Sequence, residues 1–233
     1  MSPMDINKYS GLKPTRQNYC QFIISSQINY TQTYMAEHNQ IFSHDAINRY
    51  LMEDDVSPEA VWQSIGYLVR RSGNACLIFD DTVLDKRHSF NIALVRRQYS
   101  GNEHGIVKGI GVVNCLYVNL DTNEHWIIDW RCYDPEGDGK TKLDPVRKML
   151  DDAITRKSLP FRAVLMDSWY ATKELMRHID RVGKVFYCPL KTNRNVDDSQ
   201  GKKPYKAVSD LEWFGNERLR GKVVKSPGAQ IDT

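Results

Sequence analysis

Strand-like and helix-like runs alternate after residue 74, and their order limits the fold of this chain more than any other feature. The predicted elements in chain order are a strand at NACLIFD, strands at 105–119 and 124–134, a helix at 142–157, a strand at FRAVLMD, a helix at SWYATKELMRHIDRVG that ends at Gly183, and a strand at KVFYCPLK. The turn residues LDTN predict that the second and third strands form an antiparallel hairpin. The order therefore predicts an α/β fold whose first three strands are antiparallel and whose later strands are parallel.

The first 70 residues have a different pattern, which predicts mostly helix. Ser43 precedes HDAINRYL and is a typical helix cap, and Ser57 with Pro58 marks the start of a second helix. Two short helices joined by a polar turn fit a helix-turn-helix that binds DNA, and they equally fit a plain helical hairpin. The sequence leaves both interpretations open.

Length and composition exclude several classes of protein. The 233 residues are enough for a sizeable core, and no apolar run approaches the roughly 18 residues that span a bilayer. The first 19 residues lack the apolar core of a signal peptide, so we expect a cytoplasmic protein. The five cysteines are scattered without C-x-x-C spacing, which favours buried free thiols over a zinc site or disulfides.

Carboxylates follow two of the predicted strands. Asp80 and Asp81 end the first strand, and Asp167 ends the first strand after the 142–157 helix. Sites in α/β sheets form where strand ends meet, so neighbouring strands would bring these carboxylates together. Like charges held close favour a hard divalent cation such as Mg²⁺, which prefers oxygen ligands. A polar cap at the end of each strand is the alternative for any single aspartate.

These residues carry a resemblance to a known family. LIFDDT and VLMDSWYATKELM resemble the DDE transposases of bacterial insertion sequences, in the group with a DDT first motif, and the likeness extends over roughly residues 40–225. The resemblance implies an RNase H-like mixed sheet flanked by helices, a helical N-terminal region and the start of a β-rich insertion at the C-terminus. It also implies a D-D-E triad that uses Mg²⁺ (or Mn²⁺) to cut and join DNA.

The resemblance assigns roles to individual residues. The first metal ligand is the aspartate before the threonine, Asp81, and the second is Asp167. Asp80 becomes a supporting neighbour that points elsewhere, because adjacent strand residues face opposite sides. Thr82 and Ser168 are expected to orient the carboxylates or to contact DNA.

The third carboxylate of the triad has no counterpart that fits. The family places it in a Tyr…Arg…Glu…Lys signature on a helix beyond the insertion, and neither Glu212 nor Glu217 has that surrounding sequence. We therefore expect an incomplete copy with reduced or no activity. The expected domains are a helical region at 1–72, a partial catalytic core at 73–195, and the start of the insertion with a truncated tail at 196–233.

Basic residues in predicted loops are candidates for DNA contacts. These are Arg96, Arg97, Lys191 and Arg194, which would bind phosphates. Trp169 and Tyr170 either stack on an unpaired base or pack under the following helix, and packing is favoured. The expected partners are double-stranded DNA, as transposon ends and target, and a second copy in a dimer assembled on DNA. No membrane contact is expected, and the location is cytoplasmic and nucleoid-associated.

Other interpretations stay open or are weak. The chain fits a catalytically dead remnant that binds DNA, or a metal-dependent nuclease of the same fold that does not transpose. DPEGDG resembles the start of a calcium loop, but Pro145 stands at the position of the bidentate glutamate. The histidines lack zinc-site spacing.

Overall fold

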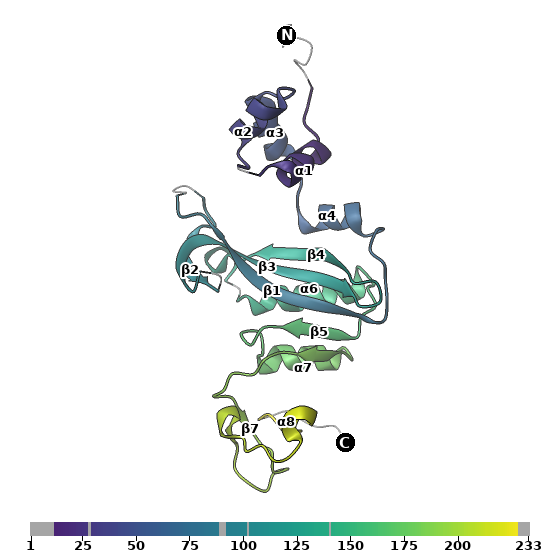
Figure 1. Cartoon of the computed structure of the whole chain (residues 1–233), viewed down its shortest axis with the longest axis vertical. Helices are drawn as coiled ribbons and strands as arrows, with labels where there is room; N and C mark the ends of the chain where they lie inside the picture. Colours follow the sequence, from purple (N-terminus) through teal and green to yellow (C-terminus); the bar gives the residue numbers. More distant parts are fainter. Residues whose placement is uncertain (1–11, 28, 89–91, 102, 140, 228–233) are drawn as a thin grey trace. The chain divides into compact units, whose positions relative to one another are not determined.

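The computed structural model describes residues 12–27, 29–88, 92–101, 103–139 and 141–227. The chain divides into two compact units, residues 1–60 and 61–233, and each is described by itself. The helices of the first unit are α1 (Arg16–Ser25), α2 (Gln32–Asn39) and α3 (His44–Glu53). α4 (Pro58–Ile65) spans the boundary (Figure 1).

Caps and a small apolar core define the first unit. The Ser43 hydroxyl accepts a hydrogen bond from the Ala46 amide at 3.2 Å, which confirms the predicted start of α3. Gln40 ends α2 in the left-handed conformation, with φ of 54°. α2 and α3 then share a core of buried apolar side chains: Met35, Phe42 and Ile47.

The expected pairing of residues 44–53 with a second helix at Pro58 is only half confirmed. The second helix begins at Pro58, and the Ala60 amide donates to the Ser57 hydroxyl at 3.2 Å. However, Ile47 of α3 is buried in the core of the first unit, whereas Trp62 of α4 packs against the core of the second. α3 and α4 therefore do not share one core, because the buried side of α3 packs against α2.

The second unit contains a mixed sheet with helices. Its strands are β1 (Ala75–Asp85), β2 (Arg96–Ser100), β3 (Gly105–Asn119), β4 (Glu124–Cys132), β5 (Ala163–Met166), β6 (Val185–Tyr187), β7 (Asn195–Val196) and β8 (Lys206–Ala207). Its helices are α5 (Pro135–Asp138), α6 (Leu143–Thr155), α7 (Lys173–Arg181), the 3-10 helix η2 (Val208–Asp210) and α8 (Glu217–Arg220).

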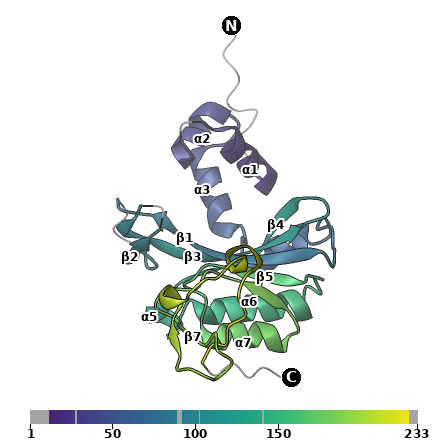
Figure 2. The same ribbon diagram turned by 60° about the horizontal axis from the view of Figure 1, so that its bottom comes forward.

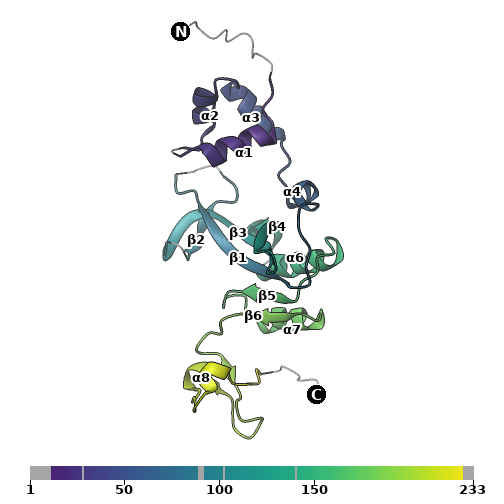
Figure 3. The same cartoon turned by 45° about the vertical axis from the view of Figure 1, so that its right-hand side comes forward.

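The strand order is β2-β3-β1-β5-β6, and β4 also pairs with β3. β1, β2, β3 and β4 pair antiparallel, whereas β1, β5 and β6 pair parallel. β1 and β3 are long strands, and both bend at the end of the sheet where β2 lies (Figure 3). The predicted α/β fold, with its mixed sheet flanked by helices, is therefore confirmed, including the 105–119/124–134 hairpin.

Two helices, α6 and α7, lie side by side against one face of the sheet (Figures 1 and 2). Leu77 and Phe79 of β1 and Val164 of β5 are buried against the apolar sides of these helices, which include Met149 and Ile179. Odd-numbered residues of β1 therefore face the helices, because successive strand residues alternate between faces. Even-numbered residues face the other side.

Three details differ from the sequence predictions. β1 does not end at Asp80 and Asp81 but continues to Asp85, because its polar half still pairs with β3. Arg96 and Arg97 lie on β2 and not in a loop, since β3 is long enough to pair with this extra strand. The helix α7 begins at Lys173, with Thr172 as its cap, and residues 168–171 form a turn.

The cysteines and the helices complete the outline. Cys76 and Cys115 are buried as expected, but Cys20 and Cys132 are exposed, because each lies on a surface position of its element. None of the helices in the described part of the chain has the length and apolar character of a membrane span.

Candidate active site

Asp80 and Asp81 lie in the middle of β1 and point to opposite faces of the sheet. Phe79 is buried in the core beneath α6 and α7, and Asp81 contacts groups on that same side. Asp80 is exposed and lines a pocket on the other side. The alternation of a strand therefore separates two neighbouring carboxylates into two environments.

Asp167 lies on the same side as Asp80. β1 and β5 are parallel neighbours, with Ile78 opposite Leu165 and Phe79 opposite Met166. Asp80 and Asp167 are the next residues along the chain after this last pair, Asp80 within β1 and Asp167 just after the end of β5. Both line a pocket of about 540 Å³ together with Ile78, Phe79, Leu165, Met166, Tyr187, Cys188 and Pro189.

The pocket is lined mainly by apolar residues, and Asp80 and Asp167 are the acidic ones. The Asp167 carboxylate accepts a hydrogen bond from the Trp169 amide at 2.8 Å, and the Asp80 carboxylate accepts one from the Asp81 amide at 2.9 Å. Neither carboxylate has a cationic partner among the described residues. Two carboxylates that line one pocket, with no counter-ion from the described residues, offer the hard oxygen ligands that a divalent cation such as Mg²⁺ prefers.

Asp81 is already occupied by protein groups. Its carboxylate forms an ion pair with the Lys142 ammonium group and accepts a hydrogen bond from the Tyr170 hydroxyl at 3.1 Å. Tyr170 is fully buried. This burial is the main cause that raises the pKa of its phenol, and the negative charge of Asp81 is the second cause. The Lys142 ammonium also lies over the rings of Tyr133 and Trp169, at 5.5 and 5.8 Å from their centroids.

The structure therefore reverses the geometry expected for the aspartate pair. The two aspartates lie on opposite faces of the sheet, and the residue that shares a pocket with Asp167 is Asp80. Asp81 was expected there and lies on the opposite face. The reason is the register, which places Asp80 one step beyond the Phe79–Met166 pair.

The supporting residues occupy less decisive positions. Thr82 is half-buried on β1 opposite Val112, and Ser168 is half-buried in the turn after Asp167. Within the part of the chain that the structure describes, no contact of the Thr82 or Ser168 side chain tests the orienting role predicted for it, so that role stays a prediction. Tyr170 packs as favoured by the sequence, whereas 46% of Trp169 is exposed.

The four basic candidates fall into two groups. Arg97 and Lys191 are exposed. Arg96 forms an ion pair with Asp134 at 2.7 Å and lies over the Tyr133 ring, and the Arg194 guanidinium donates to the Ala171 carbonyl. Arg96 and Arg194 therefore have structural partners, while Arg97 and Lys191 present their charges to solvent.

A third carboxylate does not join the pocket within the described residues. No group of three histidine, cysteine, aspartate or glutamate side chains suited to a metal occurs in them. Glu217 begins the short α8, where its carboxylate accepts from the Phe214 amide at 2.9 Å and pairs with Lys222 at 3.2 Å. The Phe214 hydrogen bond lowers the pKa of Glu217. Glu212 is exposed in the same segment.

Sequence reasoning missed Lys142, the cation that neutralises Asp81. Its signal in the sequence is weak, since it is one of several lysines around the start of the 142–157 helix. Lys142 lies immediately before α6, where the chain passes the polar half of β1.

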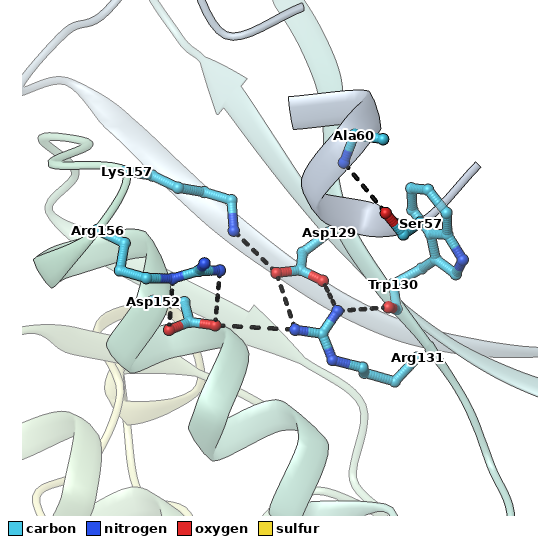
Figure 4. Close-up of polar contacts among 8 residues, drawn as sticks. All are labelled: Ser57, Ala60, Asp129, Trp130, Arg131, Asp152, Arg156 and Lys157. Carbon is cyan, nitrogen blue, oxygen red and sulfur yellow. Dashed lines mark hydrogen bonds and ion pairs between the residues drawn. The ribbon is translucent and has the colours of Figure 1, made fainter. Parts of the chain in front are cut away.

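A separate charged cluster joins α6 to β4 (Figure 4). The Asp129 carboxylate pairs with Lys157 at 2.8 Å and with Arg131, and Asp152 bridges Arg131 and Arg156 at 3.7 and 3.0 Å. Asp129 and Lys157 are both almost fully buried. These side chains are saturated by one another, which is typical of a structural network.

The sequence of this chain matches a known protein family. A family model described as DDE superfamily endonuclease matches residues 32–207. No curated protein matches the chain.

Solved structures that are similar to this chain include three transposase complexes. The Drosophila P element transposase strand transfer complex is 13% identical, with a TM-score of 0.42, over 77% of this chain and 39% of that one. The piggyBac transposase synaptic complex with hairpin DNA is 11% identical, with a TM-score of 0.44, over 78% and 43%. The Mos1 transposase paired-end complex with left transposon end is 14% identical, with a TM-score of 0.27, over 76% and 60%. The chain thus spans less than two thirds of each of these proteins.

Proposed function

The chain belongs to the DDE superfamily of endonucleases. We propose that it is an insertion-sequence transposase, which cuts and joins DNA by metal-dependent phosphoryl transfer. One observation carries the proposal. Asp80 and Asp167 line the same pocket from neighbouring strands and have no cationic partner among the described residues.

The proposal assigns the metal-binding role to this pair. Asp80 and Asp167 would hold Mg²⁺, or Mn²⁺ in its place, through their carboxylate oxygens. When bound, the ion supplies activation of the attacking oxygen and stabilisation of the leaving oxygen in phosphoryl transfer. The two aspartates contribute the negative charge. Asp80 lies on β1, and Asp167 lies at the start of the turn that directly follows β5.

The assignment moves the first ligand from Asp81, as the DDT motif suggested, to Asp80. Asp81 already has Lys142 and Tyr170 as partners, so a metal would have to compete with an ammonium group for its carboxylate. Asp80 has no such competitor among the described residues, and it faces Asp167.

DNA is the proposed substrate and partner. Arg97 and Lys191 are exposed cations that would contact phosphates and contribute affinity without sequence preference. We propose assembly as a dimer on transposon ends. Trp169, two residues after Asp167, is partly exposed, and we propose that it stacks on a base near the cut.

A second candidate function is DNA binding without cleavage. It is favoured by the number of carboxylates, because the described residues bring two and not three acidic groups to the pocket. Such a protein would occupy transposon ends and interfere with an intact transposase. A nuclease of the same fold that does not transpose is the third candidate.

A cleavage assay separates the three. A plasmid that carries the DNA flanking this gene is incubated with the protein in Mg²⁺ or in EDTA, and nicks, breaks and joined products are measured. The transposase proposal predicts Mg²⁺-dependent cutting at the gene's flanks and joined products. Salt-sensitive binding without cutting supports the second candidate, and equal cutting of unrelated DNA supports the third.

Matched variants test the site itself. Asp80→Asn and Asp167→Asn should reduce cutting to background while leaving DNA binding intact, because the amide cannot replace a charged metal ligand. Asp85→Asn is the control, since Asp85 is on the same strand but pairs with Arg87. Full cutting by Asp80→Asn would contradict the proposed site.

A further inference from the structure

Asp167 lies at the start of a tight turn whose conformation depends on Tyr170. The Tyr170 amide donates to the Asp167 carbonyl at 3.0 Å, and the Tyr170 carbonyl accepts from the Thr172 amide at 2.7 Å. The Trp169 amide donates to the Asp167 carboxylate at 2.8 Å. The direction of that carboxylate is therefore set by the same turn that places Tyr170 in the core.

Tyr170 is held at its far end by Asp81. Its ring is fully buried, and its hydroxyl donates to the Asp81 carboxylate at 3.1 Å. The position of Asp81 is fixed, because it belongs to β1 and is paired in the sheet with Val113 of β3. A buried hydroxyl that lost this acceptor would be left unsatisfied, which is unfavourable.

Lys142 completes the anchor by balancing its charge. Its ammonium pairs with Asp81, and only 14% of the Lys142 side chain is exposed. The ammonium also lies 5.8 Å from the centroid of the Trp169 ring, which belongs to the same turn. Lys142 and Tyr170 thus occupy the Asp81 carboxylate from two sides.

We propose that Asp81 is a positioning residue, which fixes the Asp167 carboxylate beside Asp80 by holding the Tyr170 hydroxyl, with Lys142 as its charge partner. The inference rests on the proposed metal site at Asp80 and Asp167. It gives the two adjacent aspartates different tasks: Asp80 binds the ion, and Asp81, on the other face, sets the position of the second ligand.

The physical need for such an anchor is clear from the charges. Two carboxylates at one pocket repel each other, so the turn carrying Asp167 would relax away from Asp80 unless it were held. Hydrogen-bonded groups behind metal ligands commonly change metal affinity about 10- to 100-fold when they are removed. The Asp81–Tyr170 contact acts one step further out, because it holds the turn whose Trp169 amide donates to the Asp167 carboxylate.

Terbium luminescence provides a direct test on the full chain. Tb³⁺ is a hard cation that prefers oxygen ligands, and the exposed Trp169 next to Asp167 serves as its sensitiser. Tyr170→Phe should weaken Tb³⁺ affinity about 10- to 100-fold and leave the signal at saturation unchanged. Asp80→Asn should remove the Trp169-sensitised signal.

The decisive variant is Asp81→Asn combined with Lys142→Met. The asparagine carbonyl still accepts the Tyr170 hydrogen bond, and the methionine leaves no unpaired cation, so a positioning role predicts Tb³⁺ affinity close to that of the parent. A direct ligand role for Asp81 predicts loss of binding as complete as in Asp80→Asn, which would overturn the inference. Unchanged affinity in Tyr170→Phe would also overturn it.

The metal site and the positioning role can fail separately. If the parent protein binds Tb³⁺ and loses it in Asp80→Asn, the proposed site stands whatever the Asp81 and Tyr170 variants show. If the parent gives no Trp169-sensitised signal, the metal site and the positioning role are both overturned. Hydrogen exchange of the Trp169 amide, which should accelerate in Tyr170→Phe, reports on the turn without any metal.

Discussion

Asp80 and Asp167 face one pocket from neighbouring parallel strands, and neither has a cationic partner among the described residues. An ion that binds this pair stabilises the folded state by mass action. At a Mg²⁺ concentration of 100 times Kd, we expect the free energy of unfolding to rise by about 2.7 kcal/mol. Thermal melting with and without Mg²⁺ measures the effect.

The neutral variants give the control for this metal prediction. Asp80→Asn removes one of two like charges, so without metal it should melt at the same temperature as the parent or above it. With Mg²⁺ it should gain little or nothing. A Mg²⁺-induced shift as large as that of the parent would show that the ion binds elsewhere.

The Asp129–Lys157 pair predicts a large loss of stability when it is broken. The two charges are 2.8 Å apart, and their side chains are 1% and 2% exposed. Lys157→Met leaves Asp129 buried with Arg131 as its remaining partner, and we expect a loss of about 3 kcal/mol or more in the free energy of unfolding. Urea denaturation measures it.

Arg156→Ala is the matched control for Lys157→Met. Arg156 pairs with Asp152 in the same cluster, but 51% of its side chain is exposed, so its loss should change stability by less than about 1 kcal/mol. Equal effects of the two substitutions would mean that burial does not decide the strength of this network.

Sequence patterns predicted the sheet well because apolar runs and turn residues define it locally. The hairpin 105–119/124–134 and the helix α6 are examples. The extension of β1 to Asp85 was not predictable, because its polar half carries no apolar pattern and is held only by pairing with β3. β2 was missed for the same reason.

The sequence identified the candidate aspartates but not which of them lie together. The rule that strand neighbours face opposite sides was right, but it does not say which of Asp80 and Asp81 faces Asp167. That choice depends on the register between β1 and β5, which are distant in the chain. Lys142 is a similar case, since its contact with Asp81 exists only once α6 packs on the sheet.

The first unit should lose stability in acid because of Asp54. Hydrogen bonds from Arg16 and Tyr50 lower the pKa of Asp54, so its folded value lies below the ordinary value of about 3.9. A lowered carboxyl pKa stabilises the folded state at pH values above the ordinary pKa. This stabilisation is lost as the pH falls through the pKa of the folded state. Hydrogen exchange of peptides from α3 is followed in the full chain from pH 6 downward. As the pH falls, α3 should lose its protection before the helices of the second unit do.

Asp54→Asn should lower the stability of α3 at neutral pH. It should also remove the part of the acid sensitivity of α3 that comes from protonation of Asp54. Asp45→Asn is the control, because 89% of the Asp45 side chain is exposed and its carboxylate lies 3.8 Å from His44. If Asp45→Asn removed as much of the acid sensitivity as Asp54→Asn, the Arg16–Asp54–Tyr50 network would not be its source.

The cysteines should react in two classes. Burial raises the pKa of the Cys76 and Cys115 thiols, whereas Cys20 and Cys132 are exposed. Because the thiolate is the reactive form, iodoacetamide should label Cys20 and Cys132 in the folded protein and the buried pair only after denaturation. Peptide mapping by mass spectrometry measures this, and rapid native labelling of Cys115 would contradict its burial.

Salt dependence of DNA binding should distinguish the exposed cations from the paired ones. Arg97→Ala and Lys191→Ala should each weaken binding to all DNA sequences and reduce the slope of log K against log salt by about 0.9 for each phosphate that is no longer neutralised. Arg96→Ala should leave the slope unchanged, because Arg96 is paired with Asp134 at 2.7 Å. It should instead lower the free energy of unfolding by about 1.5–3 kcal/mol. A slope that changes for Arg96→Ala and not for Arg97→Ala would place the DNA on the other side of β2.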